Sequence, residues 1–340
     1  MTMMTTLVCQ QPKEMLYQQR ARTEPAAGEA QLKIITAGIC GTDIHAWAGN
    51  QPFFSYPRVL GHELCGEVVA LGAGVSQFRI GQCVSVIPYL SCGTCPACES
   101  GKTNCCEKIS VIGVHQDGGF CDYLNVPVSN LLDVTGVDPE AAALIEPFAI
   151  SAHAVRRAAV QPDDSVLVVG AGPIGLGVAA IARAAGARVT VADTSPFRRD
   201  HVVHNLGLKA LDAAAEDFES QLREQFAGSL PGTVIDATGS PVAMNNAVKL
   251  IAHGGSIVFV GLHKGDIQIA DTEFHKKETT LMGSRNATHQ DFANVVQLMA
   301  AGKISAGMML NRHFEFASLA ESFESQVINN RELIKGVIHF

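Results

Sequence analysis

The stretch Ser165-Val-Leu-Val-Val-Gly-Ala-Gly-Pro-Ile-Gly175 decides how this 340-residue chain folds. A short apolar run leads into a Gly-x-Gly-x-x-Gly pattern, and an alanine-rich run typical of a helix follows it. The first glycine of such a pattern permits a tight turn, the second lets the backbone approach a pyrophosphate, and the third lets the helix pack against the strand. The phosphates lie at the helix N-terminus, where free N–H groups favour anions. We therefore predict a dinucleotide site formed by Gly170, Gly172, Pro173, Ile174 and Gly175.

An acidic residue supports this prediction. The next apolar strand, Arg188–Ala192, leads into Asp193, and a carboxylate about 20 residues beyond the first glycine binds the ribose hydroxyls of such cofactors. Because Asp193 would repel a 2′-phosphate, NAD is favoured over NADP. Arg198 and Arg199 follow closely and could neutralise that phosphate, so NADP stays open as the alternative. Further cofactor contacts are expected from Arg198, Val260, Leu262 and Ser284.

The middle of the chain, 153–285, has the alternation of a doubly wound α/β domain. Helix-like stretches separate its apolar strand candidates, and that alternation favours a parallel sheet with helices on both faces. The candidates are Ser165–Val169, Arg188–Ala192, Thr233–Ala237 and Ser256–Val260.

The two ends of the chain differ from this middle region in their pattern of apolar runs and turn residues. The last stretch, from residue 286, has one amphipathic helix candidate, Gln290–Ala300, and ends on the apolar run Gly336–Phe340. It is too short to form a core alone, so we expect 1–152 and 286–340 to form one domain together. Gly, Pro, Asn and Asp clusters separate short β-type runs near the start, as in a β-rich unit. These runs are Leu32–Ile35, Cys65–Ala70 and Cys83–Pro88.

Composition limits the classes of function. Hydrophobic residues make up 47% and charged residues 17% of the chain, so it can fill a large core and is not disordered. A net charge of −8 without a long Lys/Arg run argues against a nucleic-acid or membrane-surface partner. No apolar run reaches the ~18 residues of a membrane span. The first residues, MTMMTTLVCQ, show no secretory signal, so we expect a cytoplasmic protein that acts on a small molecule.

Five of the ten cysteines fall in one short segment. The spacing Cys92-x2-Cys95-x2-Cys98-x7-Cys106 can wrap four thiolates around one tetrahedral Zn²⁺. A closed set of four ligands leaves no position for substrate, so this metal would be structural. Cys105 competes with its neighbour as the fourth ligand. A disulfide loop is the other possibility, which the lack of a secretory signal disfavours.

A second set of potential ligands is dispersed along the chain. Thiolate, imidazole and carboxylate are all ordinary Zn²⁺ ligands, and a site with three of them and an open fourth position is catalytic. Each residue alone has a simpler interpretation, since a lone cysteine usually behaves as a small buried apolar residue. The set comprises Cys40, His62, Glu63 and Glu146.

These motifs, in this order, resemble those of the zinc-dependent medium-chain dehydrogenase/reductase family. The resemblance covers essentially the whole chain. It implies a GroES-like, β-barrel-type catalytic domain made from both ends of the chain and a Rossmann NAD-binding domain between them, with the active site in the cleft. It also implies two zinc ions per chain, one catalytic and one structural. The matching motifs are Gly38-Ile-Cys-Gly-Thr-Asp43, Gly61-His-Glu63, the four-cysteine loop, Glu146-Pro147 and the glycine-rich stretch.

The resemblance assigns metal ligands by position. Cys40 and His62 match two ligands of the catalytic zinc. The third is left open between Glu63 and Glu146, with a water between the metal and whichever carboxylate does not bind. Asp43 is implied as the acceptor that orients the His62 ring.

The resemblance also implies a proton path. Thr42 matches the hydroxyl that bonds the reacting alcohol, and His45 matches the residue that passes the proton on to solvent. The zinc would lower the pKa of the substrate hydroxyl. Its proton would leave through Thr42, the cofactor ribose and His45, while a hydride passes to the nicotinamide.

Within the family the chain looks like the sorbitol and threonine dehydrogenase branch, and most like members that act on sugar acids. The implied reaction is oxidation of L-galactonate at C5 to D-tagaturonate. Its carboxylate needs a cation, for which Arg285 comes first because a guanidinium grips both oxygens, followed by His115, His263 and Arg58. The stretches that carry this narrower resemblance are Asp43–Trp47, Asn50–Arg58, Ser110–Gly119 and Ile328–Gly336.

Two alternatives stay open. The first is a dehydrogenase of another polyol or secondary alcohol, sorbitol-like or threonine-like. The second is a non-catalytic NAD-binding protein, although such a protein would be free to lose Cys40, His62 or Thr42, which are all present. The family commonly forms dimers or tetramers, so a homo-oligomer is expected, and the apolar run Ser256–Leu262 could support the contact.

Overall fold

The glycine-rich stretch forms the strand, turn and helix that its pattern predicts. Strand β11 (Ser165–Val169) leads into the turn, and α5 (Pro173–Ala184) begins with a proline after Gly172. Gly170 takes a φ of +96°, which residues with a Cβ rarely adopt. A Cβ on Gly175 would lie 1.8 Å from the carbonyl oxygen of Gly170, so only glycine lets the helix begin this close to the strand.

The coordinates are a computed structural model that describes residues 2–51 and 54–340. Pro52 and Phe53, which belong to one of the stretches that carry the narrower resemblance, lie outside the described residues.

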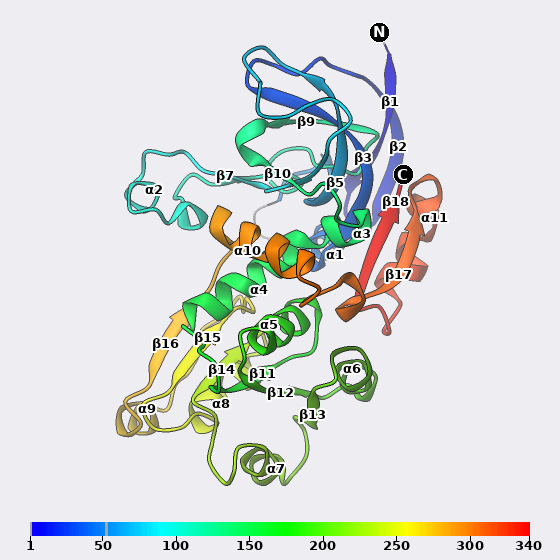
Figure 1. The fold of residues 1–340 in the computed structure, drawn as a ribbon. Coiled ribbons are helices and arrows are strands. Elements are labelled where there is room, and N and C mark those ends of the chain that lie inside the picture. Colours follow the sequence, from blue (N-terminus) through cyan, green and yellow to red (C-terminus); the bar gives the residue numbers. More distant parts are fainter. Residues whose placement is uncertain (1, 52–53) are drawn as a thin grey trace. The chain divides into compact units, whose positions relative to one another are not determined.

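Strand β11 lies inside a six-stranded parallel sheet with the order β13-β12-β11-β14-β15-β16 (Figure 1). This order reverses at β11, which confirms the doubly wound fold. Strands β13 and β16 were not among the four predicted candidates, because Lys-Ala-Leu-Asp and Thr-Leu-Met-Gly lack a β-branched run. The other strands are β12 (Arg188–Asp193), β13 (Lys209–Asp212), β14 (Thr233–Asp236), β15 (Ser256–Phe259) and β16 (Thr280–Gly283). The remaining helices of this region are α6 (Pro196–His201), α7 (Phe218–Gln225), α8 (Pro241–Asn246) and α9 (Asp271–Lys276).

The two ends of the chain share one sheet. In the described residues its order is β10-β6-β5-β3-β18-β17, with β9 paired to β3. The last strand, β18, is antiparallel to β3 and parallel to β17, so the C-terminal tail packs on the first region as expected (Figure 1). The strands are β3 (Glu29–Ile39), β5 (Glu63–Leu71), β6 (Cys83–Val86), β9 (Tyr123–Pro127), β10 (Leu131–Asp133), β17 (Leu310–Glu315) and β18 (Lys335–His339).

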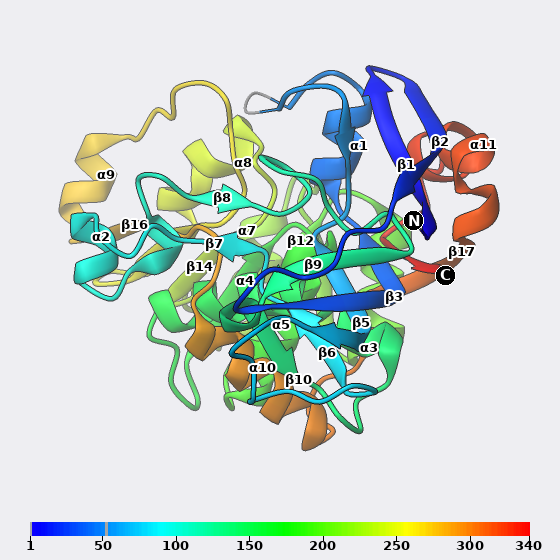
Figure 2. The same ribbon diagram turned by 90° about the horizontal axis from the view of Figure 1, so that it is seen from above.

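Smaller elements complete this region. The hairpin of β1 (Met3–Gln11) and β2 (Glu14–Ala21) lies beside α11 (Leu319–Ser322), which again joins the two ends of the chain (Figure 2). The others are β4 (Arg58–Val59), β7 (Tyr89–Leu90), β8 (Ser110–Val111), α1 (Gly41–Trp47), α2 (Pro96–Glu99), α3 (Pro139–Ala143) and α10 (His289–Ala300). Helix α4 (Ile145–Arg157) begins in this region and continues into the middle of the chain.

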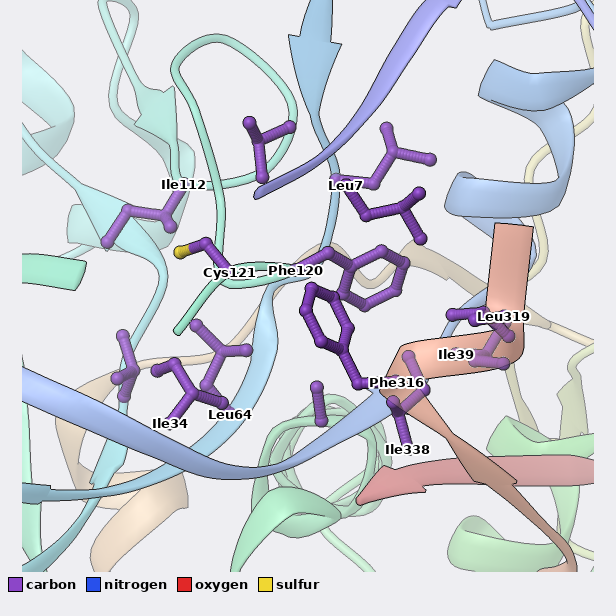
Figure 3. Close-up of a cluster of buried hydrophobic side chains, with 14 of the residues drawn as sticks. Leu7, Ile34, Ile39, Leu64, Ile112, Phe120, Cys121, Phe316, Leu319 and Ile338 are labelled. Carbon is purple, nitrogen blue, oxygen red and sulfur yellow. The ribbon is translucent and has the colours of Figure 1, made fainter. Parts of the chain in front are cut away.

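The core of this region draws on both ends of the chain. Phe120 and Leu7 from the first region lie in one cluster of buried side chains with Phe316 and Ile338 from the tail (Figure 3). All four side chains are buried. The C-terminal tail is therefore part of this core. Burying apolar surface contributes about 25 cal/mol per Å², which is the main contribution to the stability of the region.

The chain divides into two compact units. Unit 1 consists of 1–146, 288–300 and 310–340, and unit 2 of 147–287 and 301–309. The predicted terminal domain, 1–152 plus 286–340, differs from unit 1 in three segments, because 147–152, 286–287 and 301–309 lie with unit 2. Among the described residues, no helix is both long and apolar enough to cross a membrane.

Candidate active site

One buried carboxylate joins the two segments that carry the dispersed ligands. Cys40 is the residue before α1, and its backbone N–H donates to Asp43 Oδ2 at 2.8 Å. The N–H of Gly61 donates to Asp43 Oδ1 at 3.3 Å. Gly61 has a φ of +92°, and a Cβ there would lie 2.4 Å from the Phe120 ring. Asp43 thus holds the residue before α1 against the residue before His62.

Three of the predicted ligands meet in unit 1. The ligand atoms of Cys40, His62 and Glu63 all lie within 4.8 Å of one another. Strand pairing places Glu63 opposite Gly38. A Cβ on Gly38 would lie 1.9 Å from Glu63 Oε2, so the glycine leaves the space that the carboxylate fills.

The expected hydrogen bond between Asp43 and His62 is not formed. Asp43 Oδ1 lies 3.8 Å from His62 Nδ1, which is too long for a hydrogen bond. The two oxygens of Asp43 instead accept the backbone N–H groups of Cys40 and Gly61. Burial alone would lower the pKa of His62, but the nearby Cys40 thiol and Asp43 carboxylate hold it well above its usual range.

A buried lysine, which the sequence analysis missed, is paired with Glu63. Lys335 Nζ donates to Glu63 Oε1 at 2.7 Å, to Oε2 at 3.0 Å and to the carbonyl of Ile39 at 3.0 Å. The side chains of Lys335 and Glu63 are 2% and 0% exposed. Burial alone would lower the pKa of Lys335, yet the Glu63 carboxylate leaves it raised. A lysine inside an otherwise apolar strand, Ile334-Lys-Gly-Val-Ile338, was the available sequence signal.

Glu146, in the first turn of α4, is a third buried carboxylate after Asp43 and Glu63. Its Oε1 accepts a hydrogen bond from the Tyr89 hydroxyl, while Oε2 is buried without a hydrogen-bond partner among the described residues. Burial, together with the Glu63 carboxylate, raises the pKa of Glu146 to about 7, although His62 acts in the opposite direction.

These residues fit a zinc ion. Thiol, imidazole and carboxylate form an ordinary donor set for Zn²⁺. Buried polar atoms without a partner are rare in folded proteins, and among the described residues two of them, His62 Nδ1 and Glu146 Oε2, belong to predicted ligands. Glu146 is not part of the close group formed by Cys40, His62 and Glu63. A cation held by that group would satisfy the imidazole and compensate the buried carboxylates.

The two residues of the expected proton path lie on α1. Thr42 is half-buried and His45 is exposed. They are three residues apart, so they share one face of the helix. The helix therefore leads from the half-buried Thr42, two residues after the ligand Cys40, to an imidazole exposed to solvent.

The four-cysteine loop selects Cys106 over Cys105. The sulfur atoms of Cys92, Cys95, Cys98 and Cys106 all lie within 4.8 Å of one another, while Cys105 is exposed. All ten cysteines are free thiols, so the disulfide alternative is wrong for this structure. Hydrogen bonds from the Thr94 N–H and from the Cys106 thiol lower the pKa of Cys92 to about 6, which favours the metal-binding thiolate.

In unit 2 the glycine-rich turn and Asp193 are held together. The buried Asp193 carboxylate accepts the N–H of Ala171 at 2.7 Å and the N–H of Ser195 at 2.8 Å. Arg198 lies 3.9 Å from this carboxylate and near Gly172. Arg199 instead donates to the carbonyls of Asp193 and Thr194, so its guanidinium is used within the protein.

The other predicted cofactor residues follow the strands of unit 2. Val260 directly follows β15 and donates its N–H to the Asp236 carbonyl. Leu262 is 77% exposed. Ser284 follows β16, and its buried hydroxyl has no hydrogen-bond partner among the described residues.

The candidate substrate cations are scattered. Arg285 is exposed in unit 2 and His263 is half-buried in the same unit. His115 is exposed in unit 1, where its Nδ1 accepts the N–H of Val111 at 3.0 Å. Arg58 is partly neutralised by Asp117 at 3.5 Å.

Comparisons with known proteins agree with this geometry. A model of the alcohol dehydrogenase GroES-like domain matches residues 26–136, and a model of zinc-binding dehydrogenases matches residues 173–301. The chain is 67% identical to L-galactonate-5-dehydrogenase of Escherichia coli K12 over 340 residues, which is 100% of both chains.

Solved structures with the same fold cover the whole chain. The short chain alcohol dehydrogenase RspB of Escherichia coli CFT073, complexed with NADH, aligns with a TM-score of 0.93 at 31% identity over 100% of both chains. A protein of Sinorhizobium meliloti 1021 bound to NADP aligns with a TM-score of 0.93 at 26% identity, also over 100% of both chains.

Proposed function

This chain belongs to the zinc-binding alcohol dehydrogenases, and we propose from that premise that it oxidises the C5 hydroxyl of L-galactonate to D-tagaturonate with NAD⁺. The observation that carries the proposal is the 67% identity to an L-galactonate-5-dehydrogenase over the full length of both chains. The clustered Cys40, His62 and Glu63 ligands support the same chemistry.

The catalytic zinc would be held by Cys40, His62 and a carboxylate. Glu63 lies with the other two ligands but already accepts two hydrogen bonds from Lys335. Glu146 Oε2 is buried and has no hydrogen-bond partner in the part of the chain that the structure describes. We propose Glu63 as the direct third ligand and Glu146 as the residue that holds a water beside the metal. When bound, zinc supplies Lewis-acid polarisation of the substrate hydroxyl.

The chain's own side chains would move the proton. The Thr42 hydroxyl would take up the proton of the substrate alcohol as it releases its own proton toward the cofactor ribose, and the exposed His45, three residues further along the same helix face, would accept the relayed proton and release it to solvent. Thr42 is half-buried, whereas His45 ends the path where water is present.

We propose NAD rather than NADP as the cofactor. Two backbone N–H groups hold the Asp193 carboxylate in place, so a 2′-phosphate would meet a fixed, buried negative charge. Arg198 neutralises this charge only partly at 3.9 Å, and Arg199 is occupied by backbone carbonyls. A ribose 2′-hydroxyl can instead donate to the carboxylate.

The proposal also covers the cell compartment and the oligomeric state. Free thiols, including the four clustered cysteines, require a reducing compartment, which favours the cytoplasm. Strand β16 ends its sheet in the described residues and leaves one backbone edge unpaired, which favours pairing with a second copy in a homo-oligomer. Sedimentation analysis of the purified protein tests the oligomer.

The activity is tested by absorbance of NADH after mixing the protein with NAD⁺ and L-galactonate, sorbitol, L-threonine or simple alcohols. We expect the highest kcat/KM with L-galactonate, and a lower value with NADP⁺ than with NAD⁺. Faster turnover of sorbitol or L-threonine would favour the polyol alternative. The absence of turnover with every substrate, with NADH binding retained, would favour a non-catalytic NAD-binding protein.

A further inference from the structure

A cluster of two histidines and one glutamate lies outside the site described above. Glu140 comes from α3, His313 from β17 and His339 from β18, all in unit 1. Their ligand atoms all lie within 4.8 Å of one another. Nothing in the proposed dehydrogenase reaction uses these residues.

The sheet register brings the two histidines to one face. His339 pairs with Glu315 on the neighbouring strand, and His313 lies two residues before Glu315. Because side chains alternate along a strand, His313 and His339 point to the same face. Phe314 and Ile338 therefore point to the opposite face, where both join the apolar core.

The glutamate is brought to this face by the first turn of α3. Thr36, which pairs with His339 across β3 and β18, donates its hydroxyl to the Pro139 carbonyl at 2.7 Å. Asp138 caps the helix by accepting the N–H groups of Glu140 and Ala141 at 3.0 and 3.3 Å. The backbone that carries Glu140 is thus held near the two histidines.

The three donor atoms form a triangle of the size that a metal ion needs. Glu140 Oε1 lies 3.0 Å from His313 Nδ1 and 2.9 Å from His339 Nε2, and the two nitrogens are 3.5 Å apart. In a tetrahedral site with bonds of ~2.0–2.1 Å, neighbouring ligand atoms lie about 3.4 Å apart. Small side-chain rotations therefore convert this triangle into one face of a tetrahedron.

We propose that Glu140, His313 and His339 form a further metal site, which takes Zn²⁺ or a similar borderline divalent cation. Two imidazoles and one carboxylate favour zinc over magnesium or calcium, which prefer oxygen ligands alone. The His313 side chain is 56% exposed, so solvent reaches the site and water can take the fourth position. The competing interpretation is a simple ion pair between the glutamate and the histidines. In this structure, however, two ring nitrogens point at one and the same carboxylate oxygen.

The site would tie together three segments that are distant in sequence. It lies at the end of β18, about 13 Å along the strand from Lys335 at ~3.3 Å per residue. Metal binding there would stabilise unit 1 by holding α3, β17 and β18 together, without contact between this metal and the proposed ligands Cys40 and His62.

The experiment uses the purified holoenzyme without a histidine tag, dialysed to constant zinc content. It is titrated with Zn²⁺ by isothermal calorimetry, and bound zinc is counted by elemental analysis after equilibrium dialysis. We expect one equivalent above the starting content. His313→Asn and His339→Gln should weaken binding of this equivalent at least about tenfold, since each removes a ligand. The exposed His253, in unit 2, provides the control His253→Asn, which should bind as the parent does.

The result does not depend on the proposed dehydrogenase activity. Only zinc bound in addition to the zinc content of the dialysed protein is counted, and no turnover is measured. Thermal unfolding followed by Trp47 fluorescence checks that each variant is folded. The proposal is overturned if no additional equivalent binds, if the two ligand variants bind it as tightly as the parent, or if His253→Asn weakens it equally.

Discussion

Lys335→Met is the most informative single change, because it removes one member of a fully buried ion pair. Lys335 Nζ makes two hydrogen bonds to Glu63 and one to the Ile39 carbonyl. Methionine has a similar length but no charge and no donor. In the protein freed of zinc, so that no metal compensates Glu63, the variant therefore leaves the Glu63 carboxylate and one backbone carbonyl buried without these partners.

The magnitude follows from the burial of both partners. Removing one member of a buried ion pair costs about 3–5 kcal/mol. For a domain of 150–250 residues, each 1 kcal/mol lowers Tm by roughly 2–4 °C, so we expect a decrease of about 6–20 °C. Replacing both members relieves most of this cost, so the double variant Lys335→Met/Glu63→Gln should unfold at a higher temperature than the single variant.

Trp47 provides the assay. It is the only tryptophan of the chain and is 5% exposed in the core of unit 1, where it contacts Phe323. Its fluorescence therefore reports the unfolding of unit 1. Lys33→Met serves as the matched control, since Lys33 lies on β3 in the same sheet but is exposed. A surface change of this kind stays within about 0.5 kcal/mol.

The reasoning would be refuted by a Tm of Lys335→Met equal to that of Lys33→Met. It would also be refuted if the double variant unfolded at a lower temperature than Lys335→Met alone, because the buried carboxylate would then not be the cause of the instability.

Three further predictions concern the zinc sites, the proton path and pH. Cys106→Ser should lose one zinc per chain in elemental analysis while Cys105→Ser keeps it; equal loss in both would contradict the choice of Cys106. His45→Asn should lower kcat by about 10²–10⁴-fold with unchanged zinc content, whereas Cys40→Ser should lose both activity and zinc; full activity of Cys40→Ser would exclude the metal assignment. Burial raises the pKa of the Tyr17 hydroxyl, which donates to the Phe316 carbonyl, above 10.0. The protonated hydroxyl therefore stabilises the folded protein below pH 10, and this contribution is lost as the pH rises through the pKa of Tyr17 in the folded state. Tyr17→Phe removes the titrating group, so the Tm of this variant should fall less steeply at alkaline pH than the Tm of the parent.

Much of the fold and part of the site could be predicted from short stretches of sequence. The glycine pattern at 170–175 specified a turn because its glycines lie within one strand–helix junction, where Gly175 must touch the Gly170 carbonyl. The four-cysteine loop was predictable for the same reason, since all of its ligands fall within one short segment. Spacing along the chain fixes geometry when the residues are this close.

The sequence left open every contact that depends on the pairing of distant strands. Lys335 and Glu63 are 272 residues apart, and they meet only because β18 pairs with β3 and β3 pairs with β5. A slip of one residue in either pairing would put the lysine and the glutamate on opposite faces of the sheet.

Features built from one local segment therefore differ from features built from distant segments. The sequence alone determined the glycine turn and the cysteine loop, because a single local segment contains all of their atoms. The tertiary structure alone decided that Glu63 is neutralised by Lys335 and that Glu140 lies over His313 and His339. In those cases strand register and the position of α3, which the packing of the whole unit sets, place the side chains within reach of one another.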